Sequence, residues 1–84
     1  MSTVIRLTLY GRPDCHLCHE MREVVDDVGR ELAVEVDEVD VDEDAALTAA
    51  YGWDIPVLLV NGREAFRHRV SRVALRARLA AELA

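Results

Sequence analysis

The sequence predicts an α/β fold in which strands and helices follow the order βαβαββα and build a mixed four-stranded sheet flanked by helices. Three observations carry this prediction. Four segments have the composition of strands, three segments between and after them have that of helices, and an Asn-Gly pair separates the last two strands. The chain has 84 residues, of which 51% are hydrophobic, so we expect a single domain spanning 1–84 around one core.

The first strand and the first helix meet at a turn. Val4–Tyr10 is rich in strand-forming residues, and Gly11–Asp14 ends this strand. Apolar residues then recur at helical spacing over 17–32, which predicts an amphipathic helix of about four turns. We expect Asp14 to be the N-cap of this helix, which would place Cys15 in its first turn.

The middle of the chain predicts a strand, a short helix and a buried strand. Val34–Val41 has alternating valines, with a shift of phase near Asp37, and a short helix follows it through Ala50. Gly52 is expected to end this helix in the left-handed conformation. The almost entirely apolar run Pro56–Val60 is typical of a strand that is buried on both faces.

The last third predicts a hairpin and a helix. Asn61–Gly62 is a strong hairpin signal, and Arg63–His68 is expected to return as the partner strand. Ser71 can cap a final helix over Arg72–Leu83. Only the hairpin must be antiparallel, whereas the helical connections between the earlier strands favour parallel crossovers.

The charge distribution limits the classes of partner. The net charge is −6, and all 10 basic residues are arginines. Binding of nucleic acid rests on a cationic surface, so we expect no nucleic acid partner. Glu20–Asp54 is mostly acidic, whereas Arg63–Arg78 is rich in arginine, and we expect these segments to form two solvated faces.

No segment has the length and composition of a membrane span. The longest uncharged apolar run, Ile55–Val60, is too short to cross a bilayer. Met1–Thr8 lacks the long apolar stretch and the small-residue cleavage site of a secretory signal. We therefore expect a cytoplasmic protein without a membrane partner. Because thiols are kept reduced in the cytoplasm, a pair of cysteines there indicates catalysis or metal binding before structure.

Both cysteines of the chain lie in one CxxC motif, at Cys15 and Cys18. A cysteine in the first turn of a helix meets unpaired backbone N–H groups and the positive end of the helix dipole, and both stabilise a thiolate. We therefore expect Cys15 to be the nucleophile and Cys18, one turn further, to resolve a mixed disulfide. A disulfide across so short a loop contributes only roughly 2 kcal/mol, which argues against a structural staple.

Charged and titratable neighbours are expected to modulate this pair. A protonated His16 or His19 would favour a nearby thiolate, and Arg12 adds a permanent positive charge. The carboxylate of Asp14 would disfavour the thiolate, although it can act through its cap instead.

Three alternatives use the same residues differently. The pentapeptide from Cys15 to His19 matches the CxxCH haem-attachment pattern, but that chemistry needs export and usually a second axial ligand. Cys15, Cys18 and His19 could instead bind zinc or an iron–sulfur cluster bridged between two copies, although a second CxxC is absent. A redox-inert domain that binds a partner through its charged faces is the third alternative.

The motifs taken together resemble the glutaredoxins. The resemblance rests on a strand ending in Tyr10, Arg12 three residues before the first cysteine, CxxC opening a helix, and Ile55–Pro56 opening a buried strand. The stretches "YGRPDCHLC", "DVDEDAAL" and "YGWDIPVLLVNG" are similar to small bacterial glutaredoxin-like proteins of the thioredoxin fold. This resemblance implies that the Ile55–Pro56 bond is cis and packs against the sulfurs, and that Arg12, Ile55 and Pro56 bind substrate.

The resemblance also implies an activity and its partners. It indicates a monomeric thiol–disulfide oxidoreductase with no bound cofactor, acting on a disulfide-containing protein or on glutathione. Either glutathione or a reductase would regenerate its thiols. The sequence departs from the family at His16–Leu17, where proline and tyrosine are usual, and at Phe66–Ser71, which lacks the paired glycines that hold glutathione. It also lacks the tryptophan before Cys15 and the buried acid that thioredoxins have.

Overall fold

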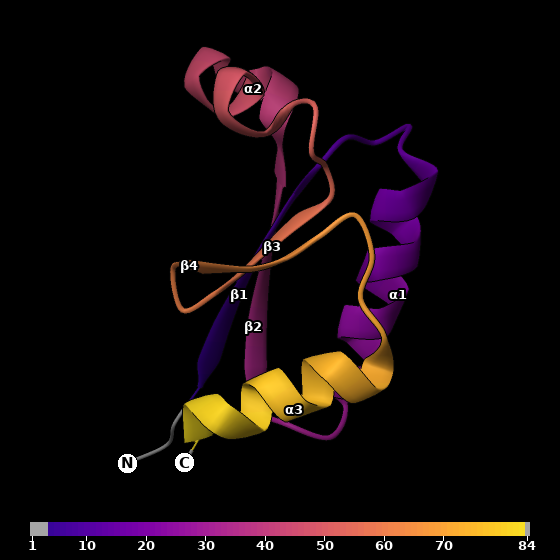
Figure 1. The fold of residues 1–84 in the computed structure, drawn as a ribbon, viewed down its shortest axis with the longest axis vertical. Coiled ribbons are helices and arrows are strands. Elements are labelled where there is room, and N and C mark those ends of the chain that lie inside the picture. Colours follow the sequence, from indigo (N-terminus) through magenta and orange to yellow (C-terminus); the bar gives the residue numbers. More distant parts are fainter. Residues whose placement is uncertain (1–3, 84) are drawn as a thin grey trace.

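The structure, a computed structural model, describes residues 4–83. Its elements follow the predicted order, with one 3-10 turn added after the second strand (Figure 1). In chain order they are β1 (Ile5–Gly11), α1 (His16–Gly29), β2 (Val34–Asp40), η1 (Val41–Glu43), α2 (Ala45–Tyr51), β3 (Val57–Val60), β4 (Arg63–Arg67) and α3 (Arg72–Leu83). Within the described part of the chain, none of the helices is both long enough and apolar enough to cross a membrane.

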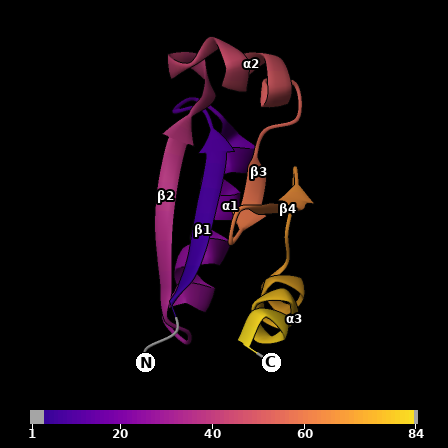
Figure 2. The ribbon, with the colours of Figure 1, turned by 90° about the vertical axis from the view of Figure 1, so that its left-hand side faces the viewer.

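The four strands form one mixed sheet in the order β2-β1-β3-β4, as predicted for a mixed four-stranded sheet. β1 and β2 are parallel, whereas β3 runs antiparallel to both β1 and β4. The expectation of a parallel crossover into β3 is therefore wrong. The reason is that α2 has only seven residues, about 10 Å of helix, and lies at the end of the sheet where β2 finishes, so the chain enters β3 from that same end (Figure 2). β2 and β4 form the two edges.

One hydrophobic core lies between the sheet and the helices α1 and α3, which are on the same side of it (Figures 1 and 2). Alternate residues of β1 point into this core, and the buried residues of both helices complete it. The most deeply buried members are Ile5, Leu7, Leu9, Met21, Val25, Val28, Leu58, Val60, Leu75 and Leu79. The apolar stripe predicted for the first helix is thus its packing face, which holds the start of α1 firmly against β1.

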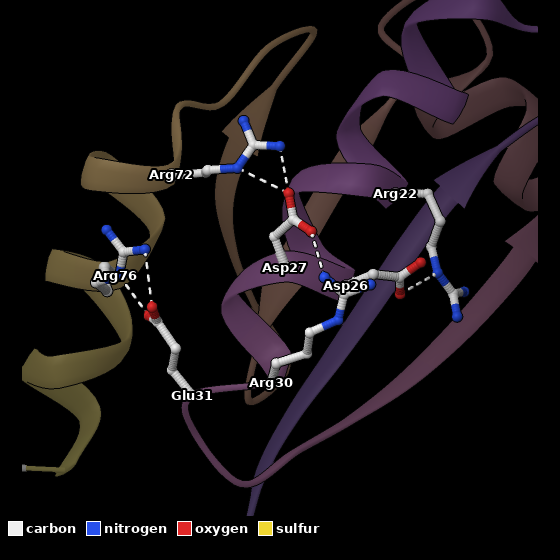
Figure 3. Close-up of polar contacts among 7 residues, drawn as sticks. All are labelled: Arg22, Asp26, Asp27, Arg30, Glu31, Arg72 and Arg76. Carbon is white, nitrogen blue, oxygen red and sulfur yellow. Dashed lines mark hydrogen bonds and ion pairs between the residues drawn. The ribbon is translucent and has the colours of Figure 1, made fainter.

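Ion pairs tie α3 to α1 along their exposed sides (Figure 3). Both Nε and Nη2 of Arg72 bind Oδ2 of Asp27, and Nη2 of Arg76 lies 3.2 Å from Oε1 of Glu31. The hydrogen bond from Arg72 is the main cause that lowers the pKa of Asp27 below its ordinary value. Arg72 and Arg76 of α3 thus meet Asp27 of α1 and Glu31, which follows α1, on a surface that is accessible to solvent, so the predicted acidic and basic faces touch there.

Three turn features show how well local signals predicted the backbone. Asn61 and Gly62 have φ values of 49° and 82°, so they form the expected hairpin turn. Ser71 Oγ accepts the N–H of Ala74 at 3.0 Å, which confirms the predicted cap of α3. The left-handed cap expected at Gly52 is wrong, because its φ is −54° and it simply extends the helical backbone.

Candidate functional site

The two cysteines lie where β1 turns into α1. Cys15 itself is the N-cap of α1, with extended backbone, and its Sγ accepts the backbone N–H of Cys18 at 3.1 Å. The prediction that Asp14 is the N-cap is therefore wrong by one residue. The sulfur of Cys15 takes the place that an oxygen usually has at a helix start, so it faces a backbone donor directly.

The cysteines form a disulfide, and their Cα atoms are 5.2 Å apart. Cys15 is partly exposed, whereas Cys18 is 4% exposed and packs inside the fold. The prediction that Cys18 is the less exposed sulfur is confirmed. Reagents from outside can thus reach Cys15 more readily than Cys18.

The sheet brings Pro56 to the same place. Tyr10 pairs with Val57, so Pro56 lies one residue before the paired part of β3, at the end of β1 that carries Gly11. A Cβ atom on Gly11 would lie 2.8 Å from Cys18 Sγ, which shows how closely the end of β1 approaches that sulfur. The Ile55–Pro56 bond is cis, as the resemblance implies.

The histidines of the motif interact with groups other than the sulfurs. His16 Nε2 lies 3.4 Å from Glu20 Oε1, one turn along α1. His19 Nε2 lies 2.8 Å from the carbonyl oxygen of Pro13, which braces the turn before Cys15. Among residues 4–83, no three His, Cys, Asp or Glu side chains gather in a way that could hold a metal ion. Modulation of the sulfurs by His16, His19 and Asp14 stays a prediction.

Arg12 ties the active-site turn to the region around α2. Its Nε donates to Asp42 Oδ2 at 2.9 Å, and its Nη1 donates to the carbonyl oxygen of Gly52 at 3.1 Å. The hydrogen bond to Asp42 is the main cause that raises the pKa of Arg12, and the charges of Asp14 and Asp40 act in the same direction. Substrate binding by Arg12 stays a prediction, but this guanidinium already has two partners within the fold.

The loop that leads from α2 to Pro56 is fixed at several points. The ring of Tyr51 stacks on that of Tyr10, with centroids 4.8 Å apart. Asp54 forms an ion pair with Arg67, in which Oδ2 and Nη1 are 2.8 Å apart. The backbone N–H of Asp54 also donates to the carbonyl of Tyr51. The carbonyl of Pro56 accepts the N–H of His68 at 2.8 Å. These contacts hold the loop in one position beside the dithiol.

Within this fixed loop, Trp53 is 96% exposed. Sequence reasoning did not select it as a site residue. The signal was present, because a tryptophan in a short polar loop directly before Ile55–Pro56 has no helical or strand face to bury it.

Two clefts flank the start of α1. One, of about 480 Å³, lies between α1 and the connection from β4 to α3, with Leu17, Arg69 and Ser71 among its lining residues. The other, of about 470 Å³, opens beside Cys18 and is lined in part by Asp40. Phe66–Ser71 is the stretch without paired glycines. Its last four residues, 68–71, form one wall of the first cleft.

Comparison with known families agrees with this geometry. Residues 6–80 match the family described as Glutaredoxin-like domain (DUF836). The chain belongs to this family. A glutaredoxin-like domain with its Cys15–Cys18 pair at disulfide distance is the arrangement that the motifs predicted.

Solved structures place the fold. A structural-genomics target protein from X. campestris is 43% identical, with a TM-score of 0.74, over 89% of this chain and 96% of that chain. A protein from Nitrosomonas europaea is 25% identical, with a TM-score of 0.79, over 93% of this chain and 94% of that chain. A thioredoxin variant from Halobacterium salinarum is also 25% identical, with a TM-score of 0.67, over 92% of this chain and 73% of that chain. The glutaredoxin-like domain thus has the thioredoxin fold.

Proposed function

We propose that this glutaredoxin-like protein is a cytoplasmic thiol–disulfide oxidoreductase in which Cys15 is the nucleophile and Cys18 the resolving cysteine. The observation that carries the proposal is the position of the Cys15 sulfur. It caps α1, accepts the N–H of Cys18 and is partly exposed, while its partner sulfur is buried behind it.

This position favours a thiolate at Cys15 once the disulfide is reduced. A hydrogen bond donated to the charged form stabilises that form, and the helix N-terminus adds its positive potential. The first turn of α1 contains no acidic residue to oppose this effect. A thiolate is the nucleophile in disulfide exchange, so the geometry supports attack by Cys15.

The exchange proceeds in two steps that balance. The Cys15 thiolate attacks one sulfur of a substrate disulfide, forms a mixed disulfide and releases the other substrate sulfur as a thiolate. The Cys18 thiolate then attacks the Cys15 sulfur, closes the internal disulfide and releases the second substrate thiolate. The substrate gains two electrons from the dithiol, and both released thiolates take up protons. Burial of Cys18 keeps outside disulfides from reaching it first.

Ile55 and Pro56 are proposed to hold the substrate beside Cys15. Two features support this role: Pro56 directly precedes Val57, which pairs with Tyr10 near the end of β1, and proline has no N–H to compete for the acceptors of an extended substrate. A disulfide-containing protein or glutathione disulfide is the substrate, and no bound cofactor is required. The oxidised protein is then reduced again by glutathione or by a reductase.

Substitution of each cysteine tests this division of roles. Cys15→Ser should abolish disulfide reduction, because the substituted hydroxyl is a far weaker nucleophile. Cys18→Ser should retain the first step and accumulate a mixed disulfide with a protein substrate, which mass spectrometry detects. Glu23→Gln, an exposed change further along α1, serves as the matched control. Equal and mild losses in both cysteine variants would refute the assignment.

The reductant is identified by offering the oxidised protein reduced glutathione or a thioredoxin reductase with NADPH, in separate reactions. Recovery of two free thiols, counted with a thiol reagent, identifies the pathway. If neither reductant restores the two thiols, and the reduced protein reduces none of the disulfides tested, the proposed activity is refuted.

A further inference from the structure

Trp53 is exposed to a degree that the fold does not explain. Its side chain is 96% exposed, compared with 74% for Val73, 46% for Leu83 and 40% for Val4, the other large exposed hydrophobic residues of 4–83. It is also the only tryptophan of the chain. An indole left in water contributes almost nothing to the core, whereas tryptophan is among the residues that contribute most to protein interfaces.

The loop presents this indole rigidly, because the residues on both sides of it are anchored. The carbonyl of Gly52 is held by Arg12, and Asp54 is held by Arg67 and by its own N–H to Tyr51. Binding of a partner would therefore cost little conformational entropy at this loop, because the loop is already ordered. Rigid aromatic side chains presented in this way act as anchors in recognition surfaces.

Trp53 belongs to the same end of the molecule as the dithiol. The guanidinium that holds Gly52 comes from Arg12, three residues before Cys15, and Trp53 lies two residues before Ile55. An extended chain covers about 3.3 Å per residue. An extended substrate segment that is bound at Cys15 is therefore expected to pass this loop.

This end of the molecule is acidic. Gly11 of β1 pairs with Asp40, and Asp42 binds Arg12, so the carboxylates around η1 lie beside the active-site turn. Figure 1 shows α2, which follows η1 closely in the chain, at the same end of the sheet as the start of α1. The carboxylates of this region are Asp40, Asp42, Glu43 and Asp44, all exposed or partly exposed. A cationic segment therefore fits this surface, whereas the carboxylates of glutathione do not.

We propose that Trp53 is a specificity-determining residue that contacts an apolar side chain of a disulfide-bearing protein, within an extended segment that also carries basic residues. This inference rests on the proposed oxidoreductase function and selects protein disulfides over glutathione disulfide as its substrates. The indole provides the apolar contact, and the carboxylates around η1 provide the attraction for the basic residues.

The test compares three disulfides with the wild type, Trp53→Ala and Val73→Ala proteins. One is a synthetic peptide disulfide flanked by leucine and arginine, the second is the same peptide with glutamate for arginine, and the third is bis(2-hydroxyethyl) disulfide. We expect Trp53→Ala to lower kcat/KM for the arginine peptide about tenfold or more and to leave the small disulfide unchanged. Val73→Ala, exposed on α3, should change neither. The wild type should prefer the arginine peptide, and added salt should reduce that preference.

A second readout does not depend on turnover. In Cys18→Ser, a mixed disulfide between Cys15 and the arginine peptide should shift the emission of the single tryptophan to shorter wavelength, because contact removes the indole from water. The mixed disulfide with bis(2-hydroxyethyl) disulfide is the control and should leave the emission unchanged.

The outcomes separate this inference from the proposed function. A wild type that reduces all three disulfides while Trp53→Ala behaves identically, without an emission shift, would overturn the role of Trp53 alone. If the wild type prefers the glutamate peptide, the proposal that the substrate segment carries basic residues is wrong. A wild type that reduces none of the three disulfides would remove the oxidoreductase function itself.

Discussion

The backbone of Gly11 lies directly against the sulfur of Cys18. A Cβ atom at position 11 would be 3.1 Å from Cβ of that cysteine, which is a tight contact, and 2.8 Å from its Sγ, which is closer than real Cβ atoms approach other atoms. The last residue of β1 therefore limits the space that the side chain of Cys18 can occupy. The small size of glycine is required here by the close approach.

Gly11→Ala should displace Cys18 and lower stability by about 1–3 kcal/mol, because the added methyl group overpacks a closed site. Urea unfolding of the reduced protein measures the effect. The loss should be smaller when Gly11→Ala is introduced into a Cys18→Ala background, where the sulfur is gone. Equal losses in both backgrounds would show that the sulfur is not the group being displaced.

Asp42→Asn should loosen the turn that carries Cys15, because it removes the charge that binds Arg12. Both side chains are accessible to solvent, so we expect little change in the temperature of unfolding. The rate of disulfide reduction should fall by up to about tenfold, since small displacements near a reacting group are costly. Asp26→Asn, which removes a pair with Arg22 on α1, provides the control and should leave that rate unchanged.

The ion pair between Asp27 and Arg72 predicts how stability depends on pH. Because folding lowers the pKa of Asp27, its contribution is present above the pKa that this residue has in the unfolded chain. The contribution is lost as the pH falls through the lower pKa of the folded state, so stability should decrease below about pH 4. Asp27→Asn should reduce stability at pH 7 and flatten this part of the profile, measured by urea unfolding at several pH values. Glu23→Gln on the same helix should leave the profile unchanged.

His68 has a backbone conformation that suits glycine better. Its φ is 66°, in the left-handed region, at the point where the chain leaves β4 beside Pro56. His68→Gly should therefore raise stability by up to about 1 kcal/mol, the relief of strain being offset in part by the entropy of glycine. Arg69→Gly, next to it but without a positive φ, should instead lower stability. If both variants lose stability, the conformation of His68 is not strained.

Local sequence signals predicted the elements well because the groups that decide them lie close together in the chain. Ser71 lies only three residues before Ala74, whose N–H it caps at the start of α3, and the hairpin turn is set by the adjacent residues Asn61 and Gly62. The N-cap of α1 was misplaced because capping preference favours an aspartate over a cysteine, while the structure uses the sulfur of Cys15.

Contacts between distant residues were not predictable from the same signals. Arg12 is 30 residues from Asp42 and 40 from Gly52, and nothing in the local sequence pairs them. Asp27 is likewise 45 residues from Arg72, and no local signal in the sequence indicates that the acidic and basic segments meet there. The placement of the loop that carries Trp53 depends on the long-range contact between Arg12 and Gly52. Sequence thus identified the cysteines but not the surface that surrounds them.

The edge strand β2 has a consequence for self-association. Four of its seven residues carry carboxylates: Glu35, Asp37, Glu38 and Asp40. Arg6 pairs with Glu35 and Arg22 with Glu38, but two copies that joined their sheets through β2 would still bring the carboxylates of Asp37 and Asp40 together, which protects an otherwise open row of backbone groups. We expect the protein to stay monomeric at neutral pH when it is concentrated, as light scattering can measure.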